Sequence, residues 1–180
     1  IVANGTEVST ITIKLTDLYD NTVLIATDTV TLIISGQGTW AEGGTTESRN
    51  IISNNGICTV PVKSTLSGSM VVFAKTNWDL NGSSVTVTTL PGTAIKIKLS
   101  CNPVSIEANG VSQSQVQAVL LDGSNNVVTI STNIITFSIS GTGTWENGSV
   151  GARFITPAGG IATTIVKSST NTGTVTIQAT

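Results

Sequence analysis

Few residues of this 180-residue chain could do chemistry, and histidine is missing from the sequence altogether. Histidine is the commonest general base, a frequent zinc ligand and the side chain that titrates near neutral pH. Without it a Ser-His-Asp triad is excluded, and no Gly-x-Ser-x-Gly nucleophile elbow is present either. The ten acidic residues suggest no convergent pair of the kind that hydrolyses glycosides. We therefore predict no catalytic residues and no enzyme activity.

Three acidic residues, Asp17, Asp20 and Asp28, lie close together in the first half of the chain. Calcium takes six to eight oxygen ligands, so a calcium site is one interpretation. The second half keeps only the first of the three, as Asp122, because the other two become asparagines. We expect these residues to form turns, and we predict no metal site and no cofactor.

Cys58 and Cys101 are the only cysteines, and their spacing fits neither a CxxC redox motif nor a zinc site. Both cysteines fall at positions of alternating apolar and polar runs, typical of β-strands, where the side chain is expected to face the protein interior. Two buried free thiols are therefore the simplest interpretation. A disulfide between modules, or between subunits, is the alternative.

The three tryptophans could also contact a ligand. Trp40 and Trp145 each follow a Gly-x-Gly-Thr sequence, whereas Trp78 has no counterpart. Exposed aromatic rings in loops could stack on sugars, which would make the protein a carbohydrate-binding module. Recurrence in both halves favours packing of the first two rings within or between modules, and leaves Trp78 as the better candidate for a contact.

Asn4, Asn81 and Asn147 each begin an Asn-Gly-Thr/Ser triplet, the acceptor pattern for N-glycosylation, in a predicted turn. Such triplets also arise by chance in a chain rich in these residues. In a secreted protein of a glycosylating organism they would be surface sites.

Composition limits the possible partners. Charged residues make up 10% of the chain, the net charge is −2, and no basic run occurs, so we predict no nucleic-acid partner. No apolar run approaches the length of a membrane span, and no signal-peptide pattern opens the sequence.

An internal repeat reveals the elements that must position these residues. Residues 1–40 align with residues 106–145 without a gap, and 18 of the 40 positions are identical. A period of this size is a whole domain rather than a solenoid repeat. We predict two domains, 1–91 and 92–180.

Alternation with period two, in short runs rich in β-branched residues, fills both copies. Ile11, Ile13 and Leu15 alternate with polar residues, and the same alternation recurs a domain later at Val116 and Ala118. Turn residues separate the runs. The pattern is typical of all-β proteins and predicts two tandem immunoglobulin-like antiparallel β-sandwiches. The short linker at 90–93 contains Pro91 and favours a semi-rigid, end-to-end rod.

The two copies differ at their ends. The strand predicted at 94–101 has no counterpart before residue 1, and the strand at 83–90 has none after residue 180. Each sandwich is thus expected to be short of one edge strand. Either the chain is part of a longer array, or neighbouring subunits supply the missing strands and build a filament by donor-strand exchange.

The residues of both copies resemble a known module. The first has the Asp20-Asn21 turn, the run 54–60 and Gly68 before its last aliphatic strand, and the second has Asp122, the run 160–164 and Gly173. This pattern resembles the bacterial immunoglobulin-like domain of the Big-1 type, found in tandem in invasin and intimin adhesins. The resemblance implies an extracellular, cell-surface, stalk-forming or adhesive protein. Its partners would be neighbouring immunoglobulin-like modules, copies of itself, or glycans and proteins of a host or cell surface. The receptor-binding tip of those adhesins has no counterpart in the sequence.

Overall fold

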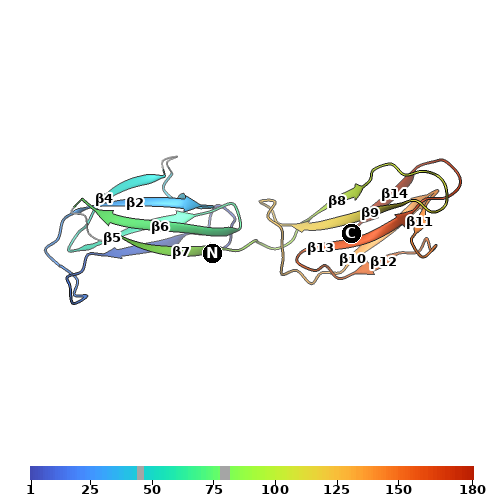
Figure 1. The fold of residues 1–180 in the computed structure, drawn as a ribbon. Coiled ribbons are helices and arrows are strands. Elements are labelled where there is room, and N and C mark those ends of the chain that lie inside the picture. Colours follow the sequence, from blue (N-terminus) through green and yellow to red (C-terminus); the bar gives the residue numbers. More distant parts are fainter. Residues whose placement is uncertain (44–46, 78–81) are drawn as a thin grey trace. The chain divides into compact units, whose positions relative to one another are not determined.

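The computed structural model describes residues 1–43, 47–77 and 82–180 of the chain. The described residues form strands, turns and loops, and none of them belongs to a helix that could cross a membrane. The chain divides into two compact units, unit 1 (Ile1–Gly92) and unit 2 (Thr93–Thr180) (Figure 1). All strand pairs within the sheets are antiparallel, so the all-β prediction is confirmed.

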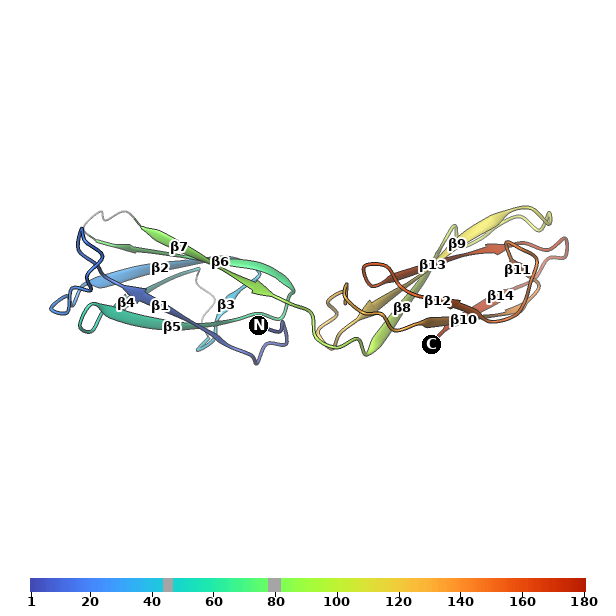
Figure 2. The same ribbon diagram turned by 90° about the horizontal axis from the view of Figure 1, so that it is seen from below.

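Unit 1 is a two-layered sandwich. One layer has the strand order β1-β5-β3 and the other the order β4-β2-β6-β7. Figure 2 shows β1 and β5 in one layer and β2, β6 and β7 in the other. The strands are β1 (Ser9–Lys14), β2 (Thr29–Gly36), β3 (Thr39–Trp40), β4 (Ser48–Ile52), β5 (Ile57–Lys63), β6 (Gly68–Thr76) and β7 (Ser83–Thr89).

Unit 2 repeats this architecture with a different set of edge strands. Its layers have the orders β11-β13-β9-β8 and β12-β10-β14. The strands are β8 (Lys96–Asn102), β9 (Gln113–Leu121), β10 (Ile135–Gly141), β11 (Thr144–Trp145), β12 (Arg153–Ile155), β13 (Ile161–Lys167) and β14 (Val175–Ala179).

Each unit buries its own core, which lies between its two sheets. Alternate residues of facing strands supply it, because successive side chains of a strand point to opposite faces. The core of unit 1 is Ile11, Val30, Leu32, Ile34, Trp40, Cys58, Val60, Val62, Met70 and Val72. The core of unit 2 is Val116, Ala118, Leu120, Ile135, Phe137, Trp145, Ala162 and Val166.

The two units match strand by strand, from β1 with β9 to β6 with β14. The turns match too: Thr16 bridges Thr22 in unit 1, and Leu121 bridges Val127 at the same offset of 105 residues. Only β7 and β8 lack a counterpart among the described residues. As a result, one edge of β1 and one edge of β14 are unpaired, whereas the equivalent edges of β9 and β6 carry β8 and β7.

Candidate functional site

Two of the three tryptophans lie inside the sandwiches. Trp40 and Trp145 are 2% and 0% exposed, and each belongs to the core of its own unit. The indole N–H of Trp145 donates to the carbonyl of Gly151 at 2.6 Å, and Arg153 lies over the ring, 5.3 Å from its centroid. Neither ring therefore presents a face to a ligand. Trp78 lies outside the described residues.

The cysteines differ in environment, and both are free thiols. Cys58 is buried in the core of unit 1, and burial raises the pKa of its thiol. The expectation that Cys101 is also buried is wrong, because this residue is exposed on β8. Six of the seven β8 side chains are exposed, and only Ile97 is half-buried, where it packs against the core of unit 2.

Two of the glycosylation candidates sit in exposed turns that their own side chains close. The carboxamide oxygen of Asn4 accepts hydrogen bonds from the amides of Thr6 and Glu7, both at 2.8 Å. That of Asn147 accepts from the amide of Ser149 at 3.1 Å and from its hydroxyl at 2.8 Å. Both side chains are exposed at the surface. Asn81 lies outside the described residues.

The acidic residues serve turns. Asp17 accepts hydrogen bonds from the amides of Tyr19 and Asn21, each at 2.9 Å, and from the side chain of Asn21. The hydrogen bond from the Asn21 side chain, followed by those from the two amides, lowers the pKa of Asp17. Asp122 makes the equivalent set of bonds but is buried. No group of three metal-ligating side chains occurs among the described residues.

A cavity lies in unit 1, between the free edge of β1 and the edge strand β7. It encloses about 470 Å³, and a second cavity of about 170 Å³ continues it along β1, with Ile13, Lys14, Ala74 and Ser83 shared by both. We call the two cavities together the β1–β7 groove. Its full lining is Ile11, Thr12, Ile13, Lys14, Leu15, Thr16, Asp17, Leu18, Val30, Val72, Ala74, Lys75, Thr76, Gly82, Ser83, Ser84 and Val85.

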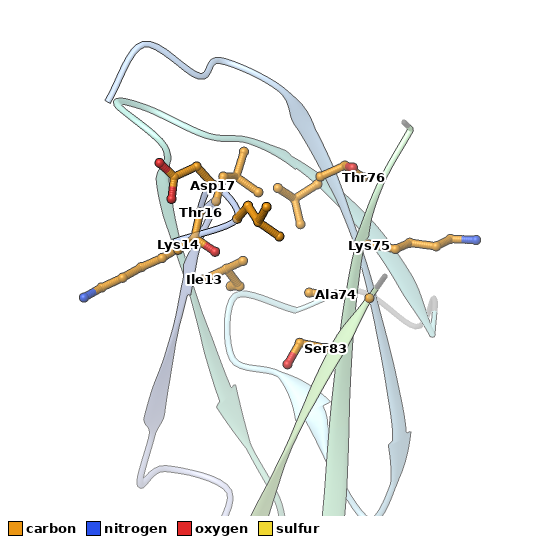
Figure 3. A pocket seen from close by; sticks show the side chains of 12 residues that line it. Ile13, Lys14, Thr16, Asp17, Ala74, Lys75, Thr76 and Ser83 are labelled. Atoms are coloured by element: carbon orange, nitrogen blue, oxygen red, sulfur yellow. The ribbon is translucent and has the colours of Figure 1, made fainter. Parts of the chain in front are cut away.

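The groove has an apolar floor and a polar rim. Ile13 and Ala74 face each other across it, from β1 and β6, whereas Lys14 and Lys75 point away into solvent (Figure 3). Thr76 also lines the groove, and its hydroxyl is buried and has no hydrogen-bond partner among the described residues. A lone threonine hydroxyl with no adjacent base is not an activated nucleophile. What the groove offers a bound molecule is an apolar floor bordered by polar side chains.

A smaller cavity of about 330 Å³ lies in unit 2 near the free edge of β14. Ala94, Ile97 and Ile135 line it together with Thr180. It carries no buried polar group without a partner among the described residues. We therefore take the β1–β7 groove as the candidate site.

Among the described residues that the sequence suggested as site residues, only Asp17 lines this groove. The sequence did not single out the other groove residues, because most of them are ordinary strand residues. One signal was present: Thr76 continues the buried alternation of Met70, Val72 and Ala74, which puts a hydroxyl at an apolar position.

One family model matches part of the chain. Residues 93–180 match the family model described as invasin, domain 3. No curated protein matches the chain.

Solved structures also match the chain. Invasin, described as a bacterial integrin-binding protein, is 20% identical with a TM-score of 0.45; the match covers 99% of this chain and 34% of that chain. The D0-D1 domain of intimin is 25% identical with a TM-score of 0.41 and coverages of 99% and 84%. A glycosyl hydrolase family 2 member from Bacteroides cellulosilyticus is 19% identical with a TM-score of 0.47 and coverages of 86% and 21%. The chain thus spans about a third of the length of invasin.

Proposed function

We propose that this chain is a non-catalytic stalk segment of an extracellular bacterial adhesin, because residues 93–180 match the family model described as invasin, domain 3, and unit 1 repeats the strand order of unit 2 apart from β7 and β8. In this role the two modules space a binding tip from the cell surface, and their partners are neighbouring immunoglobulin-like modules. The family match of unit 2 is the observation that carries the proposal.

The side chains support a structural role. Both buried tryptophans, one of the two cysteines and the carboxylates of Asp17 and Asp122 are engaged in cores or turns. Short turns and cores confined to single units are what a tandem array needs, because each module then folds without its neighbours. From the short linker that contains Pro91 and Gly92 we infer a semi-rigid rod.

Location on intact cells tests the proposal. An antibody raised against residues 1–180 is expected to label intact source cells, and mild external proteolysis should abolish the label. Labelling that requires permeabilised cells would contradict an extracellular role. Small-angle scattering of the purified chain tests the rod separately, since a semi-rigid pair of modules has a maximum dimension close to the summed lengths of both.

A filament built by strand exchange between copies is the alternative suggested by the two free edges. β7 and β8 are the strands that a neighbour would need, and each is already paired in its own unit, with β6 and β9. Exchange between copies would fill one edge only by vacating another, so the number of free edges would not fall. Electron microscopy that shows filaments of the purified chain would favour this alternative over a stalk.

Carbohydrate binding is a weaker alternative, because Trp40 and Trp145 are buried. Carbohydrate binding would therefore have to use Trp78. Titration of the chain with polysaccharides should leave its tryptophan fluorescence unchanged if the stalk proposal holds. A loss of tryptophan fluorescence that disappears in the Trp78→Ala variant would support carbohydrate binding instead.

A further inference from the structure

The turn between β11 and β12 carries an acceptor group that the proposed function does not use. It contains the triplet Asn147-Gly148-Ser149, and every residue from Glu146 to Val150 is exposed. This triplet is the acceptor pattern for N-linked glycans, a modification of surface turns. We propose that Asn147 is a glycosylation site, at which the side-chain nitrogen Nδ2 is joined to the anomeric carbon of a sugar. The site does not depend on the proposed stalk function.

The hydrogen bonds of Asn147 leave its side-chain nitrogen unused. The carboxamide oxygen Oδ1 accepts from the hydroxyl of Ser149 at 2.8 Å and from the amide of Ser149 at 3.1 Å. Nδ2 has no hydrogen-bond partner among the described residues. A carboxamide nitrogen is a weak nucleophile because it shares its lone pair with the carbonyl. Hydrogen bonds donated to Oδ1 favour the form in which negative charge lies on oxygen, and the nitrogen is then the stronger nucleophile.

The transfer reaction requires an activated sugar and a transferase. The donor is a sugar whose anomeric carbon is bonded to a phosphate, as part of either a nucleotide diphosphate or a lipid diphosphate. Nδ2 attacks that carbon, the bond between the carbon and the phosphate oxygen breaks, and the phosphate leaves with the bonding electrons. A basic group of the transferase takes one proton from Nδ2. Asn147 therefore supplies the nucleophile, and the transferase supplies the base and the donor site.

The turn holds this acceptor in one conformation. The amide of Trp145 donates to the carbonyl of Ser149 at 2.9 Å, and the amide of Gly148 donates to the carbonyl of Trp145 at 2.8 Å. The indole N–H of Trp145 reaches the carbonyl of Gly151 at the other end of the turn. These bonds tie the turn to a ring that is buried in the core of unit 2. A transferase that binds the turn thus has little conformational freedom to remove.

The space outside the turn is open. A Cβ placed on Gly148 or on Gly151 would have no atom beyond the adjacent residues within 4 Å. Val150, directly after the triplet, is 65% exposed. A transferase can therefore approach Asn147, and an attached glycan has room. The glycan would add hydrated surface to a chain in which only 10% of the residues are charged.

Asn109 provides a matched comparison within the same unit. Its Oδ1 accepts from the amide of Val111 at 2.9 Å, which is the backbone bond also made by Asn147. The glycine that follows the asparagine has a positive φ in both turns, 75° and 78°. Val111, however, has no hydroxyl, and Nδ2 of Asn109 donates to Glu107 Oε2 at 3.1 Å. Asn109 thus has the turn of an acceptor without the hydroxyl and without an unused nitrogen.

Mass spectrometry of the native protein tests the site. The protein that contains this chain would be isolated from its source cells and digested, and electron-transfer fragmentation would locate any sugar. We expect a glycan on Asn147 and none on Asn109. The unmodified chain, incubated with the soluble or the membrane fraction of the same cells, then identifies the donor. Modification by the soluble fraction with added nucleotide sugars indicates a nucleotide diphosphate donor, and modification by the membrane fraction alone indicates a lipid diphosphate donor.

Substitutions made in the source cells separate the turn from the hydroxyl. Ser149 is exposed, so Ser149→Ala should leave the fold intact and abolish the glycan on Asn147, whereas Ser149→Thr should keep it. Glu107→Ala combined with Val111→Thr supplies both features that Asn109 lacks and should make it an acceptor. Four results would overturn the proposal: a bare Asn147 in the native protein, a glycan that survives Ser149→Ala, equal modification of Asn109 in the unaltered chain, or an Asn109 that stays bare in the double variant.

Discussion

At the level of single residues, burial determines how much a hydrogen-bonded polar group contributes to the stability of this protein. Asp17 and Asp122 close the same turn with the same hydrogen bonds, yet Asp122 is 3% exposed and Asp17 is at the surface. When a buried acceptor is lost, its donors stay unpaired, whereas exposed donors turn to water. Equivalent residues of a repeat can thus contribute differently to stability.

This difference gives the first prediction. Asp122→Ala should lower the free energy of unfolding of unit 2 by about 1–3 kcal/mol, and Asp17→Ala should lower that of unit 1 by clearly less. Urea unfolding followed by tryptophan fluorescence measures both. Equal losses in the two variants would show that burial is not the cause.

The Asp17 carboxyl also predicts a pH dependence. Its pKa is lowered by the Asn21 side chain first and by the two turn amides next. Since the folded pKa lies below the unfolded one, the contribution to stability is present above the ordinary aspartate pKa and is lost as pH falls through the folded pKa. An NMR titration of the Asp17 carboxyl should show the lowered pKa, and Asn21→Ala should raise it. An Asn21→Ala variant that titrates like the parent would contradict this assignment.

The two thiols should react at very different rates. Cys101 is exposed, whereas Cys58 is buried with a raised pKa, and the thiolate is the reactive form. We expect iodoacetamide to modify only Cys101 in the folded protein and both residues in denaturant, as read by mass spectrometry. Cys58→Ser should leave the labelling of the folded protein unchanged. Modification of Cys58 under native conditions would show that unit 1 opens readily.

At the level of elements, the pairing of edge strands separates the two units. β1 and β9 have equivalent positions and similar inward faces, but only β9 is paired on both sides. Unpaired backbone N–H groups at an edge exchange with solvent more easily than paired ones.

Amide exchange should reveal this asymmetry within one sample. We expect the β1 amides that face the free edge to exchange at least about tenfold faster than their equivalents in β9. The β5-facing amides of β1 serve as the internal control, because β5 and β13 pair in the same way in both units. Uniform protection of all β1 amides would mean that the edge is already covered in solution.

Sequence patterns predicted the elements with long alternation and missed those without it. β2, β5 and β6 were evident because their apolar residues recur every second position, and the turns at Asp20 and Asn55 adopt the positive φ expected there. β4 and β12 are short and contain Arg49 and Arg153, which pair with glutamates at the surface, so no apolar period marks them.

The candidate site was not predictable in the same way. A groove depends on which edges meet, and the exposure of Cys101 shows that inward parity alone does not ensure burial. The alternation of residues within a strand decides only which side chains share a face. Whether that face is buried depends on the opposite layer of the sandwich, which the sequence of the strand does not specify.

At the level of the whole molecule, each unit has its own core and its own pair of sheets. Modules with separate cores are expected to fold and unfold independently of each other. This property sets the last prediction. Residues 1–92 and 93–180, expressed separately, should each fold, and each should unfold in urea at the same midpoint as in the full chain.

Unit 1 can be followed by itself in the full chain. Trp40 and Trp78 report on unit 1 and Trp145 reports on unit 2, so Trp145→Phe, in a chain otherwise unchanged, leaves fluorescence from unit 1 alone. The urea midpoint of each isolated unit is compared with its midpoint in the full chain. If it is lower by an amount that corresponds to more than about 1 kcal/mol of unfolding free energy, the modules stabilise each other across an interface. That result would argue for a single rigid body, whereas unchanged midpoints support a chain of independent modules joined at Gly92 and Thr93, the organisation that a repeated stalk requires.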